Sequence, residues 1–467
     1  MSETIDRLST IVGGTSVIKP SEDLDAYTSE PRGQFHGRAL CVVEPETPRD
    51  VAAFLSFCHS RNISVVPQGG NTGLVGGQTP DSSAQQIILS LRRLRAIREI
   101  DPTSDAMTVE AGVTLLETQQ AAASVNRYFP LSLASEGSCT IGGNIATNAG
   151  GVHVLAYGMM RDLVLGLEVA LVDGRLLSTL GKLRKDNTGY DLTRLFIGSE
   201  GTLGVVTAAT LKLYPRPRGH SVAFIGLKDP SQALTLLSFV RERAGPALQA
   251  FELMPRLGVD FVLQHIPGAR DPLSGSYPWY ALIELAGFVD QDADTLAARI
   301  FEQVFVSGLA EDATLAHSLD QAASLWKLRE SLSEAQKRAG ASIKHDISIA
   351  VDRVPDFIAM AGRRLAECFP DIRPVPFGHM GDGNLHYNVS QPDGGDKKEF
   401  LAKSDEINAI VHGLVREFGG SISAEHGIGV LKRDLLKEVK DPVALELMRA
   451  IKATLDPAGI LNPGKLL

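Results

Sequence analysis

The residue types most able to do chemistry are histidines and carboxylates in two glycine-flanked stretches. One stretch reads FGHMGDGNLHYNV and holds His379 and His386, and the other reads SAEHGIG and holds Glu425 and His426. Two histidines and one carboxylate form a common catalytic zinc set, because three protein ligands leave positions for substrate or water. The histidines could instead be hydrogen-bonded structural residues. His426 could be a general base, since an unperturbed imidazole titrates near neutral pH.

The spacing of the first two histidines requires a bend between them. His379 and His386 are an odd number of residues apart, which would place them on opposite faces of an uninterrupted strand. The GDG run of residues 381–383 can turn the chain and bring the imidazoles together. Beyond it the residues alternate, so that His386 and Asn388 project from one face of a predicted strand.

Cationic residues lie in a separate stretch. A helix is predicted over residues 322–339, where Arg329 borders or interrupts the apolar stripe and Ser333 lies one turn further along. Lys344 follows at the start of an alternating strand predicted over residues 343–349. A guanidinium and an ammonium that converge on a pocket would suit a carboxylate substrate. Alternatively, both head groups extend into solvent and have no such role.

Glycine is clustered in three loops of the first half of the chain. The chain has 45 glycines, and the loops read PQGGNTGLVGG, GSCTIGGNIATNAGG and GSEGTLG. Backbone N–H groups in such loops can wrap a phosphate, so the clusters predict a cofactor that carries a diphosphate. The sequence contains neither the Walker A pattern nor the G-x-G-x-x-G fingerprint. The alternative is that these glycines only serve turns.

The elements that position these loops follow from local patterns. A strand near residues 40–43, a helix capped by Thr47 with Pro48 at its first position, and a strand at 63–66 predict a βαβ unit that leads into the first glycine loop. We expect a cofactor domain over 1–217, a substrate domain over 218–415, and a C-terminal segment over 416–467 that packs back on the first domain.

Composition limits the class of protein. The 467 residues are 44% hydrophobic, and 46 Lys and Arg against 55 Asp and Glu give a net charge of −9. A nucleic-acid or anionic-membrane binder is therefore not expected. The four cysteines show no paired spacing, and no run of 18 apolar residues or signal peptide is seen. These features predict a protein of the cytoplasm.

The glycine loops, together with the ending DPAGILNPGK, resemble the FAD-binding flavoproteins of the vanillyl-alcohol oxidase and p-cresol methylhydroxylase superfamily over nearly the whole chain. The resemblance implies an α+β fold: a two-subdomain FAD-binding domain of the p-cresol methylhydroxylase type, an α+β substrate-binding domain and a C-terminal helical segment. Some relatives attach the flavin through a histidine of the first loop, where this chain has Asn71 and Thr72. Non-covalent FAD is expected.

The resemblance also assigns residues to the FAD site. Those residues are Pro67, Gln68, Gly69, Gly70, Asn71, Thr72, Gly73, Leu74, Gly137, Ser138, Cys139, Gly142, Gly143, Asn144, Ala146, Thr147, Asn148, Gly150, Gly151, Gly201, Val206 and Asn462.

Within the superfamily, LRKDNTGYDL, FGHMGDGNLHYN and SAEHGIG resemble the 2-hydroxyacid dehydrogenase branch, and the first is nearer its D-2-hydroxyglutarate members than its D-lactate members. The implied activity is oxidation of D-2-hydroxyglutarate to 2-oxoglutarate by hydride transfer to flavin N5, dependent on FAD and a divalent metal, with zinc favoured. The metal ligands would be His379, His386 and Glu425, and the catalytic base would be His426. The implied substrate-binding residues are Arg329, Ser333, Lys344 and Asn388.

Several alternatives remain at this point. A D-lactate or other D-2-hydroxyacid dehydrogenase would use the same scaffold without the need for the Arg329 and Lys344 cations. A flavin-free metallohydrolase and a non-catalytic flavin-binding protein are rivals of other classes. The electron acceptor could be an electron-transfer flavoprotein, a quinone or another oxoacid, the first favoured by the resemblance. A homodimer is one open oligomeric state.

Overall fold

The computed structural model describes residues 2–19, 23–288 and 292–467, and the chain divides into two compact units. Unit 1 comprises Met1–Gly151, Tyr157–Arg216 and Glu425–Leu467, and unit 2 comprises Val152–Ala156 and Pro217–Ala424. The expected ranges 1–217, 218–415 and 416–467 differ from these units by one residue at the first boundary and in two larger respects. The final segment begins at Glu425 and is grouped with unit 1, and a five-residue piece of the first half is grouped with unit 2.

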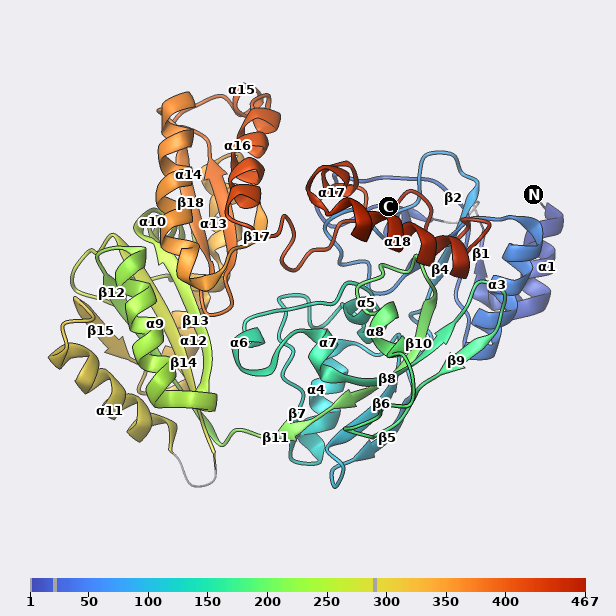
Figure 1. Cartoon of the computed structure of the whole chain (residues 1–467), viewed down its shortest axis with the longest axis horizontal. Helices are drawn as coiled ribbons and strands as arrows, with labels where there is room; N and C mark the ends of the chain where they lie inside the picture. Colours follow the sequence, from blue (N-terminus) through green and yellow to red (C-terminus); the bar gives the residue numbers. More distant parts are fainter. Residues whose placement is uncertain (1, 20–22, 289–291) are drawn as a thin grey trace. The chain divides into compact units, whose positions relative to one another are not determined.

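Unit 1 contains two principal sheets (Figure 1). The first has the order β1-β2-β4-β3, and the second has the order β5-β6-β10-β8-β9. The strands of unit 1 are β1 (Val17–Ile18), β2 (Ala39–Val43), β3 (Val65–Gln68), β4 (Gln86–Ser90), β5 (Ile97–Asp101), β6 (Ala106–Glu110), β7 (Arg127–Tyr128), β8 (Val164–Ala170), β9 (Leu176–Ser178), β10 (Val205–Lys212) and β11 (Tyr214–Pro215). Its helices are α1 (Ser2–Val12), α2 (Asp25–Thr28), α3 (Pro48–Arg61), α4 (Leu115–Ser124), α5 (Ile141–Ala146), α7 (Met160–Leu163), α8 (Leu192–Phe196), α17 (Arg433–Val439) and α18 (Pro442–Leu455), while α6 (Val154–Tyr157) spans the boundary.

The predicted strand–helix–strand unit is confirmed as β2, α3 and β3. Thr47 caps α3 through a reciprocal capping box with Asp50, and Pro48 takes the first helical position. β2 and β3 both run parallel to β4, which lies between them. The first glycine loop therefore leaves the carboxyl end of β3, where ligands commonly bind in α/β units.

The C-terminal tail returns to this sheet. The backbone N–H of Val65 donates to the carbonyl of Ile460, and the N–H of Asn462 donates to the carbonyl of Val65. These bonds lay the tail along β3, and Asn462 Nδ2 donates to the carbonyl of Gly77 at the end of the first glycine loop.

Unit 2 is built on one sheet of eight strands. Seven follow the order β15-β12-β14-β13-β18-β19-β16, and β17 also pairs with β19. The strands are β12 (Gly219–Leu227), β13 (Leu248–Pro255), β14 (Trp279–Gly287), β15 (Asp312–Leu315), β16 (Ser342–Ile343), β17 (Asp346–Ser348), β18 (Arg373–His379) and β19 (Asn384–Ser390). The helices are α9 (Pro230–Ala244), α10 (Arg256–His265), α11 (Ala293–Val306), α12 (Leu319–Glu330), α13 (Leu332–Ala339), α14 (Val354–Cys368), α15 (Lys397–Leu401) and α16 (Ser404–Glu417).

One face of this sheet carries the chemistry of unit 2. Apolar residues of α10, α12 and α13 pack there against alternate residues of β12, β13, β14 and β18. The charged Glu252 occupies the same alternation on β13, two residues before the buried Met254. Glu284 continues the alternation of the buried Tyr280 and Leu282 on β14, so two carboxylates are buried in this mainly apolar layer.

Two predicted elements of unit 2 are wrong in detail. The single helix expected over 322–339 is broken at Ser331 into α12 and α13, with the backbone of Ser331 at φ −79° and ψ −7°. The single strand expected over 343–349 is divided into β16 and β17, with Lys344 and His345 between them. Both strand segments still pair with β19, and both helix segments contribute residues to the same apolar cluster.

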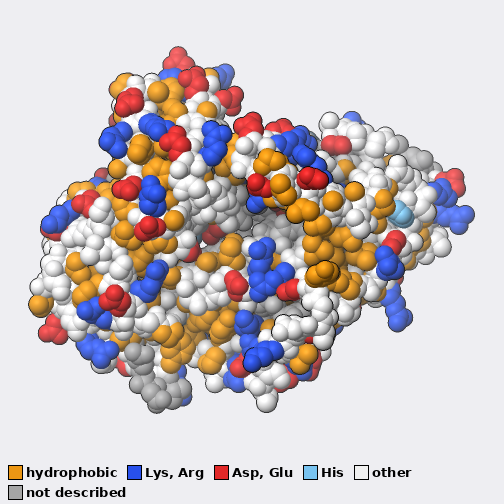
Figure 2. All heavy atoms as spheres, viewed as in Figure 1, with side chains coloured by type: hydrophobic (Ala, Val, Ile, Leu, Met, Phe, Trp, Pro, Cys, Tyr) orange, Lys and Arg blue, Asp and Glu red, His pale blue; other side chains and the backbone are white. Residues whose placement is uncertain are grey.

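The surface carries charged side chains of both signs, in agreement with the similar numbers of basic and acidic residues in the sequence. Figure 2 shows acidic and basic side chains interspersed over the face in view. Among the residues that the structure describes, no helix is long and apolar enough to cross a membrane.

Candidate active site

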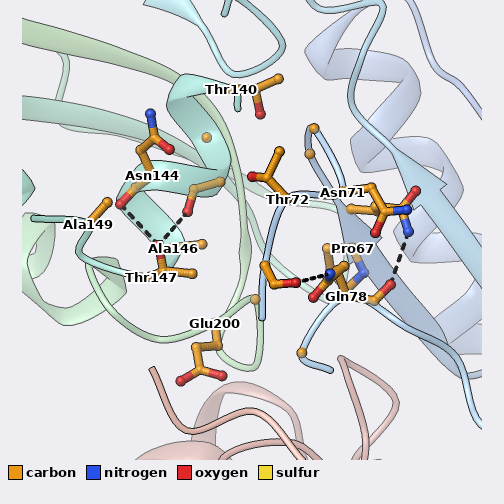
Figure 3. A pocket seen from close by; sticks show the side chains of 18 of the residues that line it. Pro67, Asn71, Thr72, Gln78, Thr140, Asn144, Ala146, Thr147, Ala149 and Glu200 are labelled. Atoms are coloured by element: carbon orange, nitrogen blue, oxygen red, sulfur yellow. Dashed lines mark hydrogen bonds between the residues drawn. The ribbon is translucent and has the colours of Figure 1, made fainter. Parts of the chain in front are cut away.

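A pocket of about 610 Å³ lies within unit 1, a size typical of ligand sites. The three predicted glycine loops, the SAEHGIG stretch and the C-terminal tail all line it. Figure 3 shows Pro67 and Asn71 on one side of the pocket and Asn144 and Thr147 on the other. Residues far apart in the sequence therefore form one cavity.

Most of the residues assigned to the FAD site line this pocket. Those that do are Pro67, Gln68, Gly69, Gly70, Asn71, Thr72, Gly73, Leu74, Gly142, Gly143, Asn144, Ala146, Thr147, Gly150, Gly201, Val206 and Asn462. Those that lie outside the lining are Gly137, Ser138, Cys139, Asn148 and Gly151. The second loop lines the pocket with residues between Thr140 and Gly150, and the backbone of Ser138 and Cys139 packs against Gly70 of the first loop.

Gly70 shows why the two loops need glycine. A Cβ atom at Gly70 would lie 1.9 Å from the carbonyl oxygen of Ser138. No side chain fits in that space, so the first loop packs directly on the backbone of the second.

Unsatisfied oxygen atoms indicate what the pocket can bind. Gln68 Oε1, Asn71 Oδ1, Thr140 Oγ1 and Asn462 Oδ1 are buried and have no hydrogen-bond partner within the described residues, and all four residues line the pocket. The three amide oxygens only accept hydrogen bonds, and the Thr140 hydroxyl can accept or donate, so the pocket suits a ligand that carries O–H or N–H donors. The ribityl hydroxyls and the ring N–H of a flavin are such donors, and the lining fits FAD.

Glu200 joins the third glycine loop to the segment that carries His426. Its Oε1 accepts a hydrogen bond of 2.7 Å from the N–H of Ile428, and its Oε2 accepts one of 2.8 Å from the N–H of Gly429. Its backbone carbonyl accepts a hydrogen bond from Asn462 Nδ2. Burial raises the pKa of the Glu200 carboxyl, although the two N–H donors oppose that rise.

The backbone of Glu200 is strained to make this link. Its φ of 52° is in the left-handed region, which costs a non-glycine residue on the order of 1 kcal/mol or more. The surrounding bonds hold it there and place Glu425 and His426 in the pocket lining.

In unit 2 the turn brings His379 and His386 together as predicted. His379 ends β18 and His386 lies in β19, and their ring centroids are 5.8 Å apart. His379 Nδ1 is 2.6 Å from Oε1 of the buried Glu252. A histidine held at Nδ1 by a carboxylate presents Nε2 to a metal, as metal-binding histidines commonly do. Two ligands of the expected metal set are thus in suitable positions.

The expected substrate residues have different surroundings. Arg329 is buried, its Nε donates to Glu252 Oε2 at 2.6 Å, and its guanidinium lies over the Phe377 ring. Ser333 is exposed in the first turn of α13, and Lys344 is half-buried between β16 and β17. Asn388 is buried, and its Nδ2 donates to Gln336.

Sequence reasoning missed three residues here. Glu252 and Gln336 hold Arg329, His379 and Asn388, and Glu200 holds the segment after His426. A signal existed for Glu252, since a lone acid in the apolar run LQAFELMP is unusual for a buried strand.

Comparisons with known proteins place these features in a family. The profile described as "FAD linked oxidases, C-terminal domain" matches residues 216–466, and that described as "FAD binding domain" matches residues 39–180.

Named relatives match nearly the whole chain. "D-2-hydroxyglutarate dehydrogenase, mitochondrial" of Bos taurus is 42% identical over 98% of this chain and 82% of its own. "D-2-hydroxyglutarate dehydrogenase" of Stutzerimonas stutzeri is 36% identical over 99% of this chain and 98% of its own. The sequence expectation of this branch is thereby confirmed.

A solved structure confirms the fold class. P-cresol methylhydroxylase with substrate bound superposes with a TM-score of 0.74 at 19% identity, over 100% of this chain and 96% of its own.

We predict that Glu200→Ala weakens flavin binding and stability. The change leaves two N–H groups without an acceptor, at about 1–3 kcal/mol for each that stays buried, and frees the segment after His426. Retained flavin and the melting temperature should both fall. Glu438→Ala, at an exposed position of α17, is the matched control. A Glu200→Ala protein with the flavin affinity of the control would contradict the role given to this carboxylate.

Proposed function

Because the chain belongs to the FAD-linked oxidase family and is an FAD-dependent dehydrogenase, we propose that it oxidises D-2-hydroxyglutarate to 2-oxoglutarate. The observation that carries the proposal is the burial and hydrogen bonding of the Arg329 side chain. Its side chain is 10% exposed, and its Nη1 and Nη2 make no hydrogen bond to a described residue. A buried guanidinium with two such donor nitrogens suits a carboxylate, and D-2-hydroxyglutarate has a second carboxylate for it.

The remaining roles follow from chemistry. FAD, bound without a covalent link, would accept a hydride at N5. A divalent ion, with zinc favoured, would be held by His379, His386 and Glu425 and would lower the pKa of the substrate hydroxyl. His426 would take the hydroxyl proton. Arg329, Ser333 and Lys344 would bind the distal carboxylate, and Asn388 the carboxylate beside the reacting carbon.

Gln336 supports the proposed role of Asn388 in substrate binding. The Oε1 of Gln336 accepts a hydrogen bond from Asn388 Nδ2, and this bond fixes the orientation of the Asn388 amide. Asn388 Oδ1 can then accept from the substrate, and the second N–H of Nδ2 can donate to it. Gln336 Nε2 in turn donates to Ser390. The bonds give Asn388 a defined orientation before substrate binds.

The acceptor and location are also proposals. An electron-transfer flavoprotein is the favoured acceptor, and a quinone is the alternative. Some relatives are named mitochondrial and the Stutzerimonas stutzeri relative is named without a compartment. The unpaired spacing of the four cysteines supports a cytoplasmic location for this chain.

We predict that D-2-hydroxyglutarate bleaches the bound flavin under anaerobic conditions. A panel of D- and L-2-hydroxyacids, mixed with holoenzyme and followed at the flavin absorbance band, measures substrate class directly. D-2-hydroxyglutarate should react faster than D-lactate and L-2-hydroxyglutarate. Faster bleaching by D-lactate would replace the proposed substrate with the D-lactate alternative, and protein purified without flavin would favour a metallohydrolase.

Metal removal should abolish most of the activity. His379→Ala or His386→Ala deletes a ligand, and we expect loss of bound zinc and of turnover while FAD content stays unchanged, because the glycine loops belong to unit 1. Chelation should have the same effect and zinc should reverse it. His317→Ala, at an exposed histidine of unit 2, is the control. Full activity in metal-free protein would return both histidines to a structural role.

Lys344→Met should discriminate between substrates. Loss of one charge-assisted hydrogen bond is worth about 1.5–3 kcal/mol, so kcat/KM for D-2-hydroxyglutarate should fall roughly ten- to a hundredfold. D-lactate, which lacks the distal carboxylate, should be affected far less. Lys397→Met changes an exposed lysine of the same unit and should alter neither rate. Equal losses for both substrates would remove Lys344 from the distal-carboxylate site.

A further inference from the structure

Glu252 is a fully buried carboxylate that contacts one guanidinium and one imidazole. It lies on β13 with 0% of its surface exposed. Oε2 accepts from Arg329 Nε at 2.6 Å, and Oε1 is 2.6 Å from His379 Nδ1. A buried carboxylate persists only when donors satisfy both oxygens. Here each oxygen is used by a residue with a different proposed task.

Each contact determines which nitrogen of the partner faces Glu252. Bonding at Nδ1 leaves Nε2 as the imidazole nitrogen that can bind a metal. Bonding at Nε leaves Nη1 and Nη2, the forked end of the guanidinium, which makes no hydrogen bond to a described residue. The Glu252 carboxylate therefore orients the His379 ring through Nδ1 and the Arg329 guanidinium through Nε.

Glu252 is held rigidly because it lies in an inner strand of the sheet. Glu252 pairs with Leu282 of β14 on one side and with His379 of β18 on the other. Its backbone and that of His379 are thus neighbours in register, and α12 supplies Arg329 from above the same face. A shift of the carboxylate would move both partners together.

From this arrangement we infer that Glu252 is a positioning residue that couples metal binding by His379 to recognition of the distal carboxylate by Arg329. The inference rests on the proposed function and deepens it. It requires that one substitution alter two separable properties, the affinity for the metal and the preference for a dicarboxylate. A residue of purely structural importance would alter neither selectively.

The same sheet offers a matched control. Glu284 on β14 is likewise buried, and its oxygens bind Trp326 Nε1 at 2.7 Å, His220 Nδ1 at 3.0 Å and His153 Nε2 at 3.3 Å. Trp326 and Arg329 are one turn apart on α12. Glu284 thus resembles Glu252 in burial, partners and helix contact, but its partners are not proposed ligands of metal or substrate.

The test compares Glu252→Gln with Glu284→Gln in the full-length holoenzyme. A glutamine amide accepts hydrogen bonds only at its oxygen. When that oxygen accepts from Arg329, the amide nitrogen can only donate to His379 Nδ1, and this favours the tautomer with its proton on Nε2, the nitrogen that would bind the metal. Zinc affinity, measured by titration with a competing chelator, should weaken about ten- to a hundredfold in Glu252→Gln. At saturating zinc, KM for D-2-hydroxyglutarate should rise about tenfold, equivalent to about 1.4 kcal/mol, while KM for D-lactate stays near the wild-type value.

Glu284→Gln should leave zinc affinity and both KM values unchanged, and Glu252→Asp should restore part of the zinc affinity. Wild-type zinc affinity and KM in Glu252→Gln, or equal losses in Glu284→Gln, would overturn the coupling. If Glu252→Gln fails to fold, Glu252→Asp and Glu284→Gln make the same comparison. A wrong substrate assignment gives a different result: wild-type holoenzyme would bind zinc, but D-2-hydroxyglutarate would not reduce its flavin. In that case the zinc titration still tests whether Glu252 positions His379.

Discussion

The organisation of both units depends on the cost of burying a carboxylate. A charged carboxyl group removed from water must receive hydrogen bonds or cations at both oxygens, or it destabilises the fold by several kcal/mol. Glu252 and Glu284 meet this requirement in unit 2, and Glu200 meets it in unit 1. In each case the donors come from distant parts of the chain, so satisfying the charge also positions the donors.

In unit 2 this constraint orients a helix. Trp326 and Arg329, one turn apart on α12, reach Glu284 and Glu252 respectively. The two bonds connect α12 to the buried carboxylates of the sheet, while Leu325 and Leu328 pack the helix in the apolar core. Arg329 and His379 lower the pKa of the Glu252 carboxyl against the effect of its burial, so the carboxylate stays ionised and continues to hold both partners.

Local patterns account for much of the fold and part of the candidate site. Capping at Thr47, glycine clustering and the GDG turn each depend on residues close in sequence, and the structure contains the helix, the pocket loops and the paired histidines that they predict. The break at Ser331 and the bonds of Glu252 and Glu200 could not be read locally. Glu200 binds an N–H 228 residues away, and Arg329 lies 77 residues from Glu252, so these contacts depend on how sheets and loops assemble.

The most direct measurement of the proposed chemistry follows the hydrogen at C2 of the substrate. Anaerobic holoenzyme would be mixed with D-2-hydroxyglutarate or with the same compound deuterated at C2, and flavin absorbance and 2-oxoglutarate would be measured together. The account predicts one 2-oxoglutarate per flavin reduced and slower reduction by the deuterated compound. Flavin that stays oxidised with a saturating amount of D-2-hydroxyglutarate, or 2-oxoglutarate formed without flavin reduction, would contradict it.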